Sequence, residues 1–440
     1  MKTKLFLTII SILIIVNAKA QTWFPIGIGA NNVITAFFTD TATNTLYVGG
    51  AFTQLNGVSA NKIIKYDGYN WTPMGSGMSS TVNAIIKYNG EIYAGGDFQY
   101  ADGNTVNAIA KWNGTSWVSV GQGICTYGVR AMEIYNGELY AAGAFSPANG
   151  SSYNIIAKWN GTTWTNIGST LTGPNLFIYA LKTFNGELYA GGWNFYGSGV
   201  SAMTIAKWNG TNWSDLYPGT NGSISTLEIY NNKLFVGGAF DNSCGWPTSS
   251  SHVAIWTGSE WQPAGIGMDN VVQDFAVYDG ELYAGGNFLT ADGDTVNHIA
   301  KWNGTNWSAM PSTGLNDWVY ELGVYNSDLY AGGNFTTAGG TSAQYIARWS
   351  TSNNIFDIYR NNDIKVYPLP FNNNATIEFE NHNEIFSLTI FDSKGQSVQQ
   401  INNIASGQVT IERKNMVRGL YFFTLRKDKS IIYSGKIIVE

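Results

Sequence analysis

A seven-residue phrase that recurs along the chain constrains its fold more than any other feature. The phrase is Leu-Tyr-Ala-Gly-Gly-x-Phe with small variations, and it occurs seven times. Its first glycine, or the alanine that replaces it, falls at Gly49, Gly95, Ala142, Gly191, Gly237, Gly285 and Gly332. The copies are therefore 46 to 49 residues apart.

Each repeat contains the pattern of a four-stranded antiparallel sheet. In the second copy the strand-like segments are Val82–Tyr88, Glu91–Phe98, Ala108–Trp112 and Trp117–Val120. Asn89-Gly90 and Asn113-Gly114 separate them in pairs, and Asn-Gly favours the positive φ angles of tight hairpin turns. A four-stranded unit with this period is typical of a propeller blade. We therefore predict an all-β chain that contains a seven-bladed β-propeller.

The two ends of the repeat array indicate how the ring closes. The last copy reads Ala347-Arg348-Trp349-Ser350 and lacks the second tryptophan of its siblings. The missing piece stands at the other end, where Thr22–Gly29 matches Trp71–Gly77. We expect residues 21–355 to form the propeller, with the N-terminal strand completing the last blade, because closure removes the free edges of an open array.

The repeats resemble kelch and galactose-oxidase-like propellers. The resemblance is carried by the Gly-Gly that ends the second strand, by Tyr66-Asp67 and by Trp71. It implies a binding platform, whereas the oxidase branch needs a copper site of Tyr, His and Cys side chains. His252 and His298 form no such group with the two cysteines of the chain, so we expect no metal, no cofactor and no enzymatic activity.

The last eighty residues follow a different pattern and resemble the type A C-terminal sorting domain of type IX secretion in Bacteroidota. Short strand-like runs predict a small Ig-like β-sandwich over residues 361–440. The resemblance implies export across the outer membrane and the type IX secretion machinery as a partner. It is carried by Tyr367-Pro368-Leu369-Pro370, Ile390-Phe391-Asp392 with Gly395, Gly419-Leu420-Tyr421-Phe422 and Lys436-Ile437-Ile438-Val439.

Residues 1–20 are typical of a secretory signal peptide. Lys2 and Lys4 precede the apolar run Leu5–Val16, and Ala18-Lys19-Ala20 is a cleavage signal. We therefore expect the protein to pass through the periplasm and to be secreted or held on the outer cell surface, as a monomer. Residues 21–360 hold 12 basic and 22 acidic side chains, which argues against nucleic acid as a partner. Cys125 and Cys244 lie in blades two apart, so we expect them to be unpaired.

One face of the predicted propeller varies in sequence, whereas the other carries short and similar turns. Variable loops on a constant scaffold are the usual arrangement of a binding platform. Exposed aromatic side chains suit a glycan or a protein ligand, although they could equally cover the loops. A varying inner-strand position holds Asn83, Arg130, Tyr179, Ser225, Gln273 and Tyr320. The candidate ligand-binding residues are Tyr127, Arg130, Tyr179, Trp193, Phe195, Tyr196, Trp246, Trp318 and Tyr320.

Two alternatives to a binding protein remain open. Asp274 and Glu321 occupy equivalent positions in neighbouring blades, and a carboxylate pair could hydrolyse a glycoside. Solvated acids in the channel, or one acid paired with Arg130, are favoured over that role. The third possibility is a purely structural surface component. Asp102 and Asp292 belong to Asp-Gly segments that we interpret as turns rather than calcium sites, because further carboxylates are missing.

Overall fold

A computed structural model describes most of the chain after residue 20. The described residues are 21–124, 128–145, 154–167, 171–172, 176–193, 196–197, 204–216, 218–241, 250–350, 364–379, 384–427 and 430–440. The predicted signal peptide and both cysteines lie outside them. Within these ranges all regular structure is β, as predicted, and no helix is long and apolar enough to cross a membrane.

Seven four-stranded antiparallel sheets follow one another along the chain, and we call them blades 1 to 7. Blade 1 comprises β2 (Ile34–Asp40), β3 (Thr45–Gly50), β6 (Ile63–Tyr66) and β7 (Trp71–Pro73). Blade 2 comprises β8 (Val82–Tyr88), β9 (Glu91–Gly96), β12 (Ile109–Trp112) and β13 (Trp117–Ser119). Blade 3 comprises β14 (Val129–Tyr135), β15 (Glu138–Phe145), β16 (Asn154–Trp159) and β17 (Trp164–Asn166). Blade 4 comprises β19 (Phe177–Phe184), β20 (Glu187–Trp193), β22 (Ile205–Trp208) and β23 (Trp213–Asp215). Blade 5 comprises β24 (Ser223–Tyr230), β25 (Lys233–Ala239), β26 (Val253–Trp256) and β27 (Trp261–Pro263). Blade 6 comprises β28 (Val272–Tyr278), β29 (Glu281–Gly286), β32 (Ile299–Trp302) and β33 (Trp307–Ala309). Blade 7 comprises β34 (Val319–Tyr325), β35 (Asp328–Gly333), β38 (Ile346–Ser350) and the N-terminal strand β1 (Thr22–Pro25).

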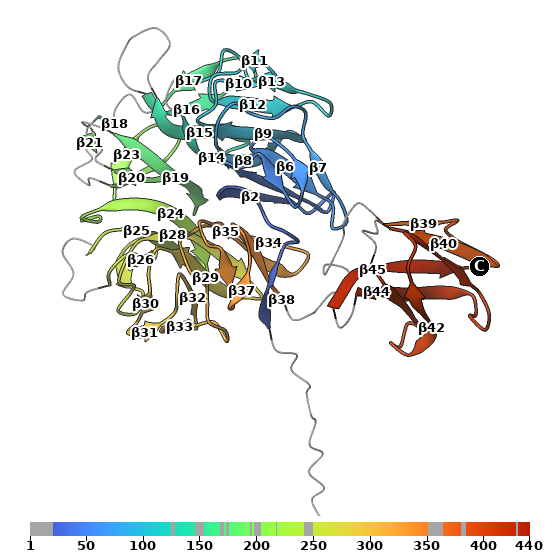
Figure 1. The fold of residues 1–440 in the computed structure, drawn as a ribbon. Helices are drawn as coiled ribbons and strands as arrows, with labels where there is room; N and C mark the ends of the chain where they lie inside the picture. Colours follow the sequence, from blue (N-terminus) through green and yellow to red (C-terminus); the bar gives the residue numbers. More distant parts are fainter. Residues whose placement is uncertain are drawn as a thin grey trace, which may run out of the picture.

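The first strand of each blade contacts the first strand of the next, and β34 of blade 7 contacts β2 of blade 1. The sheets are thus arranged as a closed ring around a central channel (Figure 1). The closing strand is the predicted one, since Thr22 pairs with Ser350 and Pro25 with Ala347. The indoles of Trp23 and Trp349 pack there at 5.4 Å.

The glycines of the repeated phrase allow neighbouring blades to pack closely. A Cβ atom on Gly49 would lie 2.7 Å from Cγ1 of Val82 in the next blade, and Gly95 faces Val129 in the same way at 2.5 Å. The second glycine is restricted within its own blade, because a Cβ on Gly50 would lie 2.3 Å from the carbonyl oxygen of Val33. At both positions, a side chain would therefore occupy space that the neighbouring atoms already fill.

Tryptophan on the outer strand connects each of blades 2 to 6 to the preceding blade. The indole Nε1 of Trp117 in blade 2 donates to the carbonyl of Met74 at the end of blade 1, over 3.0 Å. Four later copies repeat this bond over 2.9–3.1 Å, namely Trp164 to Val120, Trp213 to Ile167, Trp261 to Leu216 and Trp307 to Ala264. Several of these rings also belong to the buried cores between blades, where large aromatic side chains bury much apolar area.

Five short strand pairs extend the loops, and the sequence did not predict them as strands. They are β4 (Gln54–Leu55) with β5 (Val58–Ser59), β10 (Tyr100–Ala101) with β11 (Asn104–Thr105), β18 (Leu171–Thr172) with β21 (Tyr196–Gly197), β30 (Thr290–Ala291) with β31 (Asp294–Thr295), and β36 (Thr337–Ala338) with β37 (Thr341–Ser342). The third pair, β18 with β21, is not a hairpin, because β18 precedes the first strand of blade 4 and β21 follows the second; the others are tight hairpins.

The aspartates of two tight hairpins connect neighbouring blades. One carboxylate oxygen of Asp292 accepts the backbone N–H groups of Ile266 (2.6 Å) and Gly267 (2.9 Å) in blade 5, and the other accepts that of Trp307 (2.6 Å) in blade 6. Asp102 makes the equivalent bonds between blades 1 and 2. Hydrogen bonds to a charged acceptor are the stronger kind. The two aspartates therefore lie in turns, as the sequence predicts, and their carboxylates also join neighbouring blades.

Residues after 363 form two sheets around one core. The three-stranded sheet contains β39 (Lys365–Tyr367), β40 (Asn374–Glu378) and β43 (Gln408–Glu412), and the four-stranded sheet contains β41 (Phe386–Phe391), β42 (Ser397–Ile404), β44 (Gly419–Lys427) and β45 (Ser430–Val439). Side chains from both sheets, including Ile377, Leu388 and Phe423, share the buried core. This is the predicted small sandwich, and β42 is the strand that the sequence did not reveal.

The Asp292 contacts predict a stability difference within one hairpin. Asp292→Ala should lower the free energy of unfolding by about 1–3 kcal/mol, because three backbone donors lose a charged acceptor. Equilibrium urea unfolding followed by tryptophan fluorescence measures the change. Asp294→Ala in the same hairpin is the matched control, since Asp294 is exposed and should change stability by less than about 0.5 kcal/mol. Equal effects of the two substitutions would contradict the assignment.

Candidate functional site

Each blade carries a β-bulge near the start of its first strand. In all seven blades the pairing with the second strand skips one residue, for example between Val82 and Ala84. A bulge leaves the extra residue unpaired and redirects its side chain, and bulges are common beside active sites. The skipped residues are Thr35, Asn83, Arg130, Tyr179, Ser225, Gln273 and Tyr320.

These seven bulge residues define the candidate site, which we call the mouth ring. Six of them are the varying inner-strand position found in the sequence, and Thr35 is the member that the sequence analysis missed. They lie at the ends of the first strands that also carry the variable loops. The scaffold is therefore the same in every blade, whereas the side chain differs from blade to blade.

Blades 1 to 3 carry three consecutive polar members of the mouth ring. The guanidinium of Arg130 contacts both carboxylate oxygens of Asp97, over 3.0 Å and 3.2 Å. Asn83 donates to Asp97 over 3.3 Å and to the carbonyl of Val129 in the next blade, and Thr35 donates likewise to Val82 over 2.7 Å. The sequence analysis did not identify Asp97, although it is an acid directly after the Gly-Gly, where other copies have Ala51 or Asn287.

The aromatic part of the ring lies on blades 4 and 7. The rings of Phe177 and Tyr179 are stacked, with centroids 6.0 Å apart, and Trp193 pairs with Phe177 across the two strands. Trp318 and Tyr320 meet edge to face at 5.9 Å. Trp193 and Trp318 are 43% and 36% exposed, so each blade presents an indole face to solvent beside a bulge tyrosine.

The structure therefore brings Arg130, Tyr179 and Tyr320 to one ring and places Trp193 and Trp318 beside it. Burial raises the pKa of both tyrosines, so their hydroxyls are neutral donors near pH 7. Tyr196 lies in strand β21, of which only the backbone is described. Tyr127, Phe195 and Trp246 lie outside the described residues.

Asp274 and Glu321 are held by the blades that follow them, directly after the bulge residues Gln273 and Tyr320. One carboxylate oxygen of Asp274 accepts the backbone N–H of Leu322 over 2.8 Å, and the other accepts the hydroxyl of Thr226 over 3.1 Å. Glu321 accepts the backbone N–H of Phe37 over 3.4 Å. This row of bonds connects blades 5, 6, 7 and 1.

The expectation that one of these acids pairs with Arg130 is wrong, whereas both acids remain partly exposed. Arg130 pairs with Asp97. Burial raises the pKa of Asp274 to about 7, and burial together with the charge of Asp274 raises the pKa of Glu321 well above its usual range. A buried acid keeps its proton because the surroundings solvate the charged form poorly.

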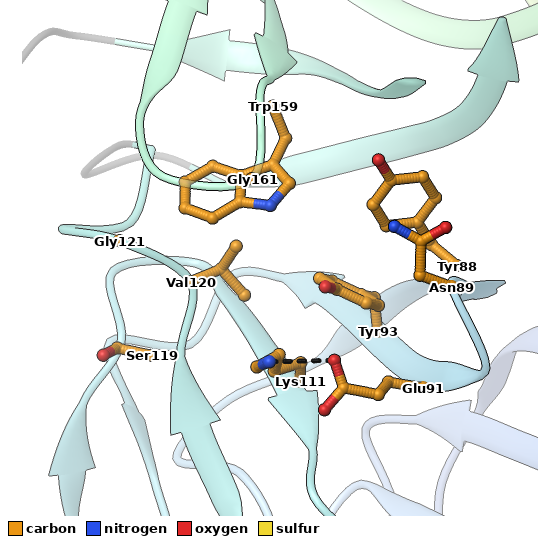
Figure 2. A pocket seen from close by; sticks show the side chains of 10 residues that line it. All are labelled: Tyr88, Asn89, Glu91, Tyr93, Lys111, Ser119, Val120, Gly121, Trp159 and Gly161. Atoms are coloured by element: carbon orange, nitrogen blue, oxygen red, sulfur yellow. Dashed lines mark hydrogen bonds and ion pairs between the residues drawn. The ribbon is translucent and has the colours of Figure 1, made fainter. Parts of the chain in front are cut away.

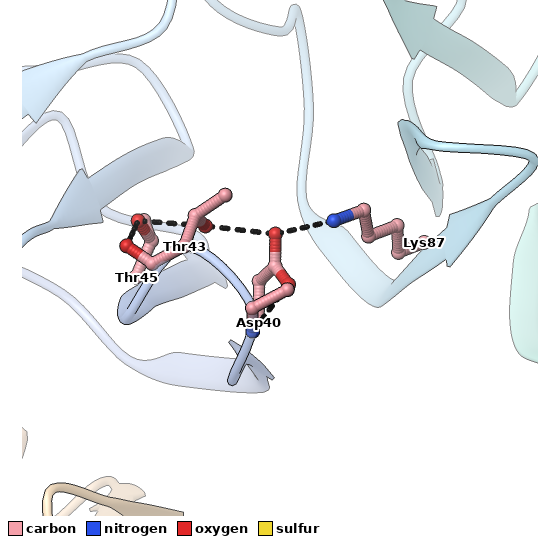
Figure 3. Close-up of polar contacts among 5 residues, drawn as sticks. Asp40, Thr43, Thr45 and Lys87 are labelled. Carbon is pink, nitrogen blue, oxygen red and sulfur yellow. Dashed lines mark hydrogen bonds and ion pairs between the residues drawn. The ribbon is translucent and has the colours of Figure 1, made fainter.

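Ion pairs also join the first strands near their opposite ends. Asp40 accepts from Lys87 of the next blade over 2.7 Å and from Thr43 over 2.8 Å, as Figure 3 shows. The hydrogen bond from Lys87 is the main reason that the pKa of Asp40 is below its usual value. Lys182 and Glu228 form a similar pair over 2.7 Å between blades 4 and 5. These contacts were not visible in the sequence, because the partners are 46 or 47 residues apart.

The raised pKa of Asp274 predicts a pH dependence of stability. An unfolded aspartate has a pKa of about 3.9, so the folded protein binds this proton more tightly than the unfolded chain does. Its contribution to stability is complete below about pH 4 and is lost as the pH rises through about 7. Asp274→Asn should therefore flatten the fall of the melting temperature between pH 4 and pH 8. Asp294→Asn is the control, and parallel curves for Asp274→Asn and wild type would contradict the prediction.

Comparison with known families agrees with the two-part organisation. The family described as the secretion system C-terminal sorting domain matches residues 365–440. The family described as the Rax2 C-terminal beta propeller domain matches residues 13–190, less than half of the chain. No curated protein matches the chain.

Two solved structures from B. thetaiotaomicron are similar to the chain at low identity. One is the extracellular domain of a proposed hybrid two-component system, with 12% identity, a TM-score of 0.44 and coverage of 93% of this chain and 55% of that one. The other is the extracellular domain of a proposed one-component system, with 14% identity, a TM-score of 0.47 and coverage of 95% and 59%. The chain thus spans little more than half of either protein. The family matches and the geometry together identify a β-propeller followed by a type IX secretion sorting domain, which directs export to the cell surface.

Proposed function

We propose that this chain is a non-enzymatic binding protein of the cell surface, or a secreted one, whose mouth ring recognises a glycan or a protein. The observation that carries the proposal is the bulge found in every blade, which presents six residue types across the seven blades. A structural need common to all blades would be met by one residue type. Variation at the redirected residue instead favours recognition of a ligand.

The chemistry of the mouth ring suits a neutral, partly apolar ligand. Exposed Trp193 and Trp318 provide faces for stacking on sugar rings or on side chains of a partner. The charge of Arg130 is already matched by Asp97, so the ring has no free cation on that side to select an anionic ligand. Two aromatic clusters on different blades also favour a ligand long enough to reach both.

Glycoside hydrolysis by Asp274 and Glu321 is the second candidate function. In its favour, the raised pKa of both groups is typical of acid–base pairs. Against it, each carboxylate already accepts a hydrogen bond from the backbone of the following blade. A purely structural surface component is the third candidate, and the kelch-like type of the repeats stays a prediction.

Binding to the mouth ring can be tested on a glycan array and in pull-down assays against surface proteins. Tyr320→Ala and Trp193→Ala should each weaken binding by at least about tenfold, because both remove a large contact surface. Tyr69→Ala is the matched control, since Tyr69 is 60% exposed but lies in the hairpin turn of blade 1. If the two site variants bind like the control, the mouth ring is not the site. Release of reducing sugar that disappears in Asp274→Asn would instead support the hydrolase.

A further inference from the structure

The gap between blades 2 and 3 contains a cavity of about 200 Å³, away from the mouth ring. Figure 2 shows its lining side chains, which come from all four strands of blade 2 and from the third strand of blade 3. The hairpin residue Asn89 borders it, so it opens on the side of the short turns. We propose that this cavity is a second binding site, which takes a single neutral pyranose ring.

Aromatic side chains form one part of the lining. Tyr88 and Tyr93 meet edge to face with centroids 5.7 Å apart, and Trp159 of blade 3 lies across the cavity from them. Aromatic faces stack on the C–H faces of sugar rings as they do on other apolar surfaces. Burial and the neighbouring Glu91 raise the pKa of Tyr93 to about 12, so this phenol is neutral near pH 7.

An ion pair forms the polar part of the lining. Glu91 and Lys111 are 2.8 Å apart, and their side chains are 36% and 32% exposed. Together they offer a carboxylate acceptor and an ammonium donor without a net charge. This combination suits vicinal hydroxyl groups and disfavours a charged ligand, which would disrupt the pair.

The side chain of Tyr88 lines the cavity, whereas two equivalent tyrosines use their hydroxyls to join neighbouring blades. At the equivalent position, Tyr230 donates to the carbonyl of Gly280 over 3.0 Å and Tyr325 donates to that of Asn44 over 3.1 Å, each in the following blade. Among the described residues Tyr88 makes no such bond, although only 8% of the residue is exposed. A hydroxyl that is not engaged with the next blade is available to donate to, or accept from, a hydroxyl of a ligand in this cavity.

The volume limits the size of the ligand. Pockets for drug-sized molecules enclose roughly 300–1,000 Å³, and this cavity is smaller. One sugar ring fits this limit better than an oligosaccharide or a peptide. A ligand with so few atoms should bind with a dissociation constant on the order of 1 mM.

The test uses the purified full chain and a panel of methyl hexopyranosides, with binding followed by saturation-transfer NMR. At least one glycoside should bind the wild type, and Glu91→Gln should weaken that binding at least tenfold. Glu187→Gln is the matched control, because Glu187 forms the equivalent ion pair with Lys207 in blade 4. Tyr88→Phe, which keeps the ring and the fold, should also weaken binding.

Three results would overturn the proposal: no glycoside binds, Glu91→Gln binds like the wild type, or Glu187→Gln weakens binding as much as Glu91→Gln does. Tyr320→Ala separates this site from the mouth ring. It should leave binding of the monosaccharide unchanged, even where it abolishes binding of the larger ligand. Loss of monosaccharide binding in Tyr320→Ala would assign the sugar to the mouth ring and overturn the second site.

Discussion

The hydrogen bond from an outer-strand indole to the preceding blade is the interaction on which the rest of the propeller depends. A single four-stranded sheet exposes both of its faces, and it gains a buried core only by packing on its neighbours. Trp117 and its equivalents fill the widening outer part of each gap, and their N–H groups find a carbonyl there. In blades 2 to 6 the bond runs to the preceding blade, so it holds these sheets at a constant separation.

A rigid periphery lets the channel wall vary. Near the axis the blades are joined by individual contacts, such as Asp40 with Lys87 or Asp274 with Leu322, which differ from one gap to the next. The bulge belongs to the backbone and persists whichever side chain it carries, from Thr35 to Tyr320. Substitution in the mouth ring therefore changes the surface offered to a ligand without changing the frame.

The sequence predicted the fold well because the information for it is periodic. The repeated phrase, the Asn-Gly turns and the divided last repeat were enough to place the blades and to identify β1 as the closing strand. The position of the mouth ring was also predictable, since it varies directly after a position that is isoleucine or valine in every blade. The contacts of Asp97, Asp292 and Asp274 were not, because each depends on the register between blades, which no pattern within one repeat encodes. The partial burial of Asp274 and Glu321 likewise depends on the packing of neighbouring blades, so their raised pKa values could not be inferred.

The pairing of β1 with β38 has a consequence for the order of assembly. The two strands are separated by more than three hundred residues, so loop closure makes this contact slow to form. Until it forms, β38 keeps an open edge that the β1 segment of another copy could occupy equally well. Crowded chains emerging together would then exchange their first strands and become linked in pairs. Dilution during export thus favours the self-closed ring over the exchanged dimer.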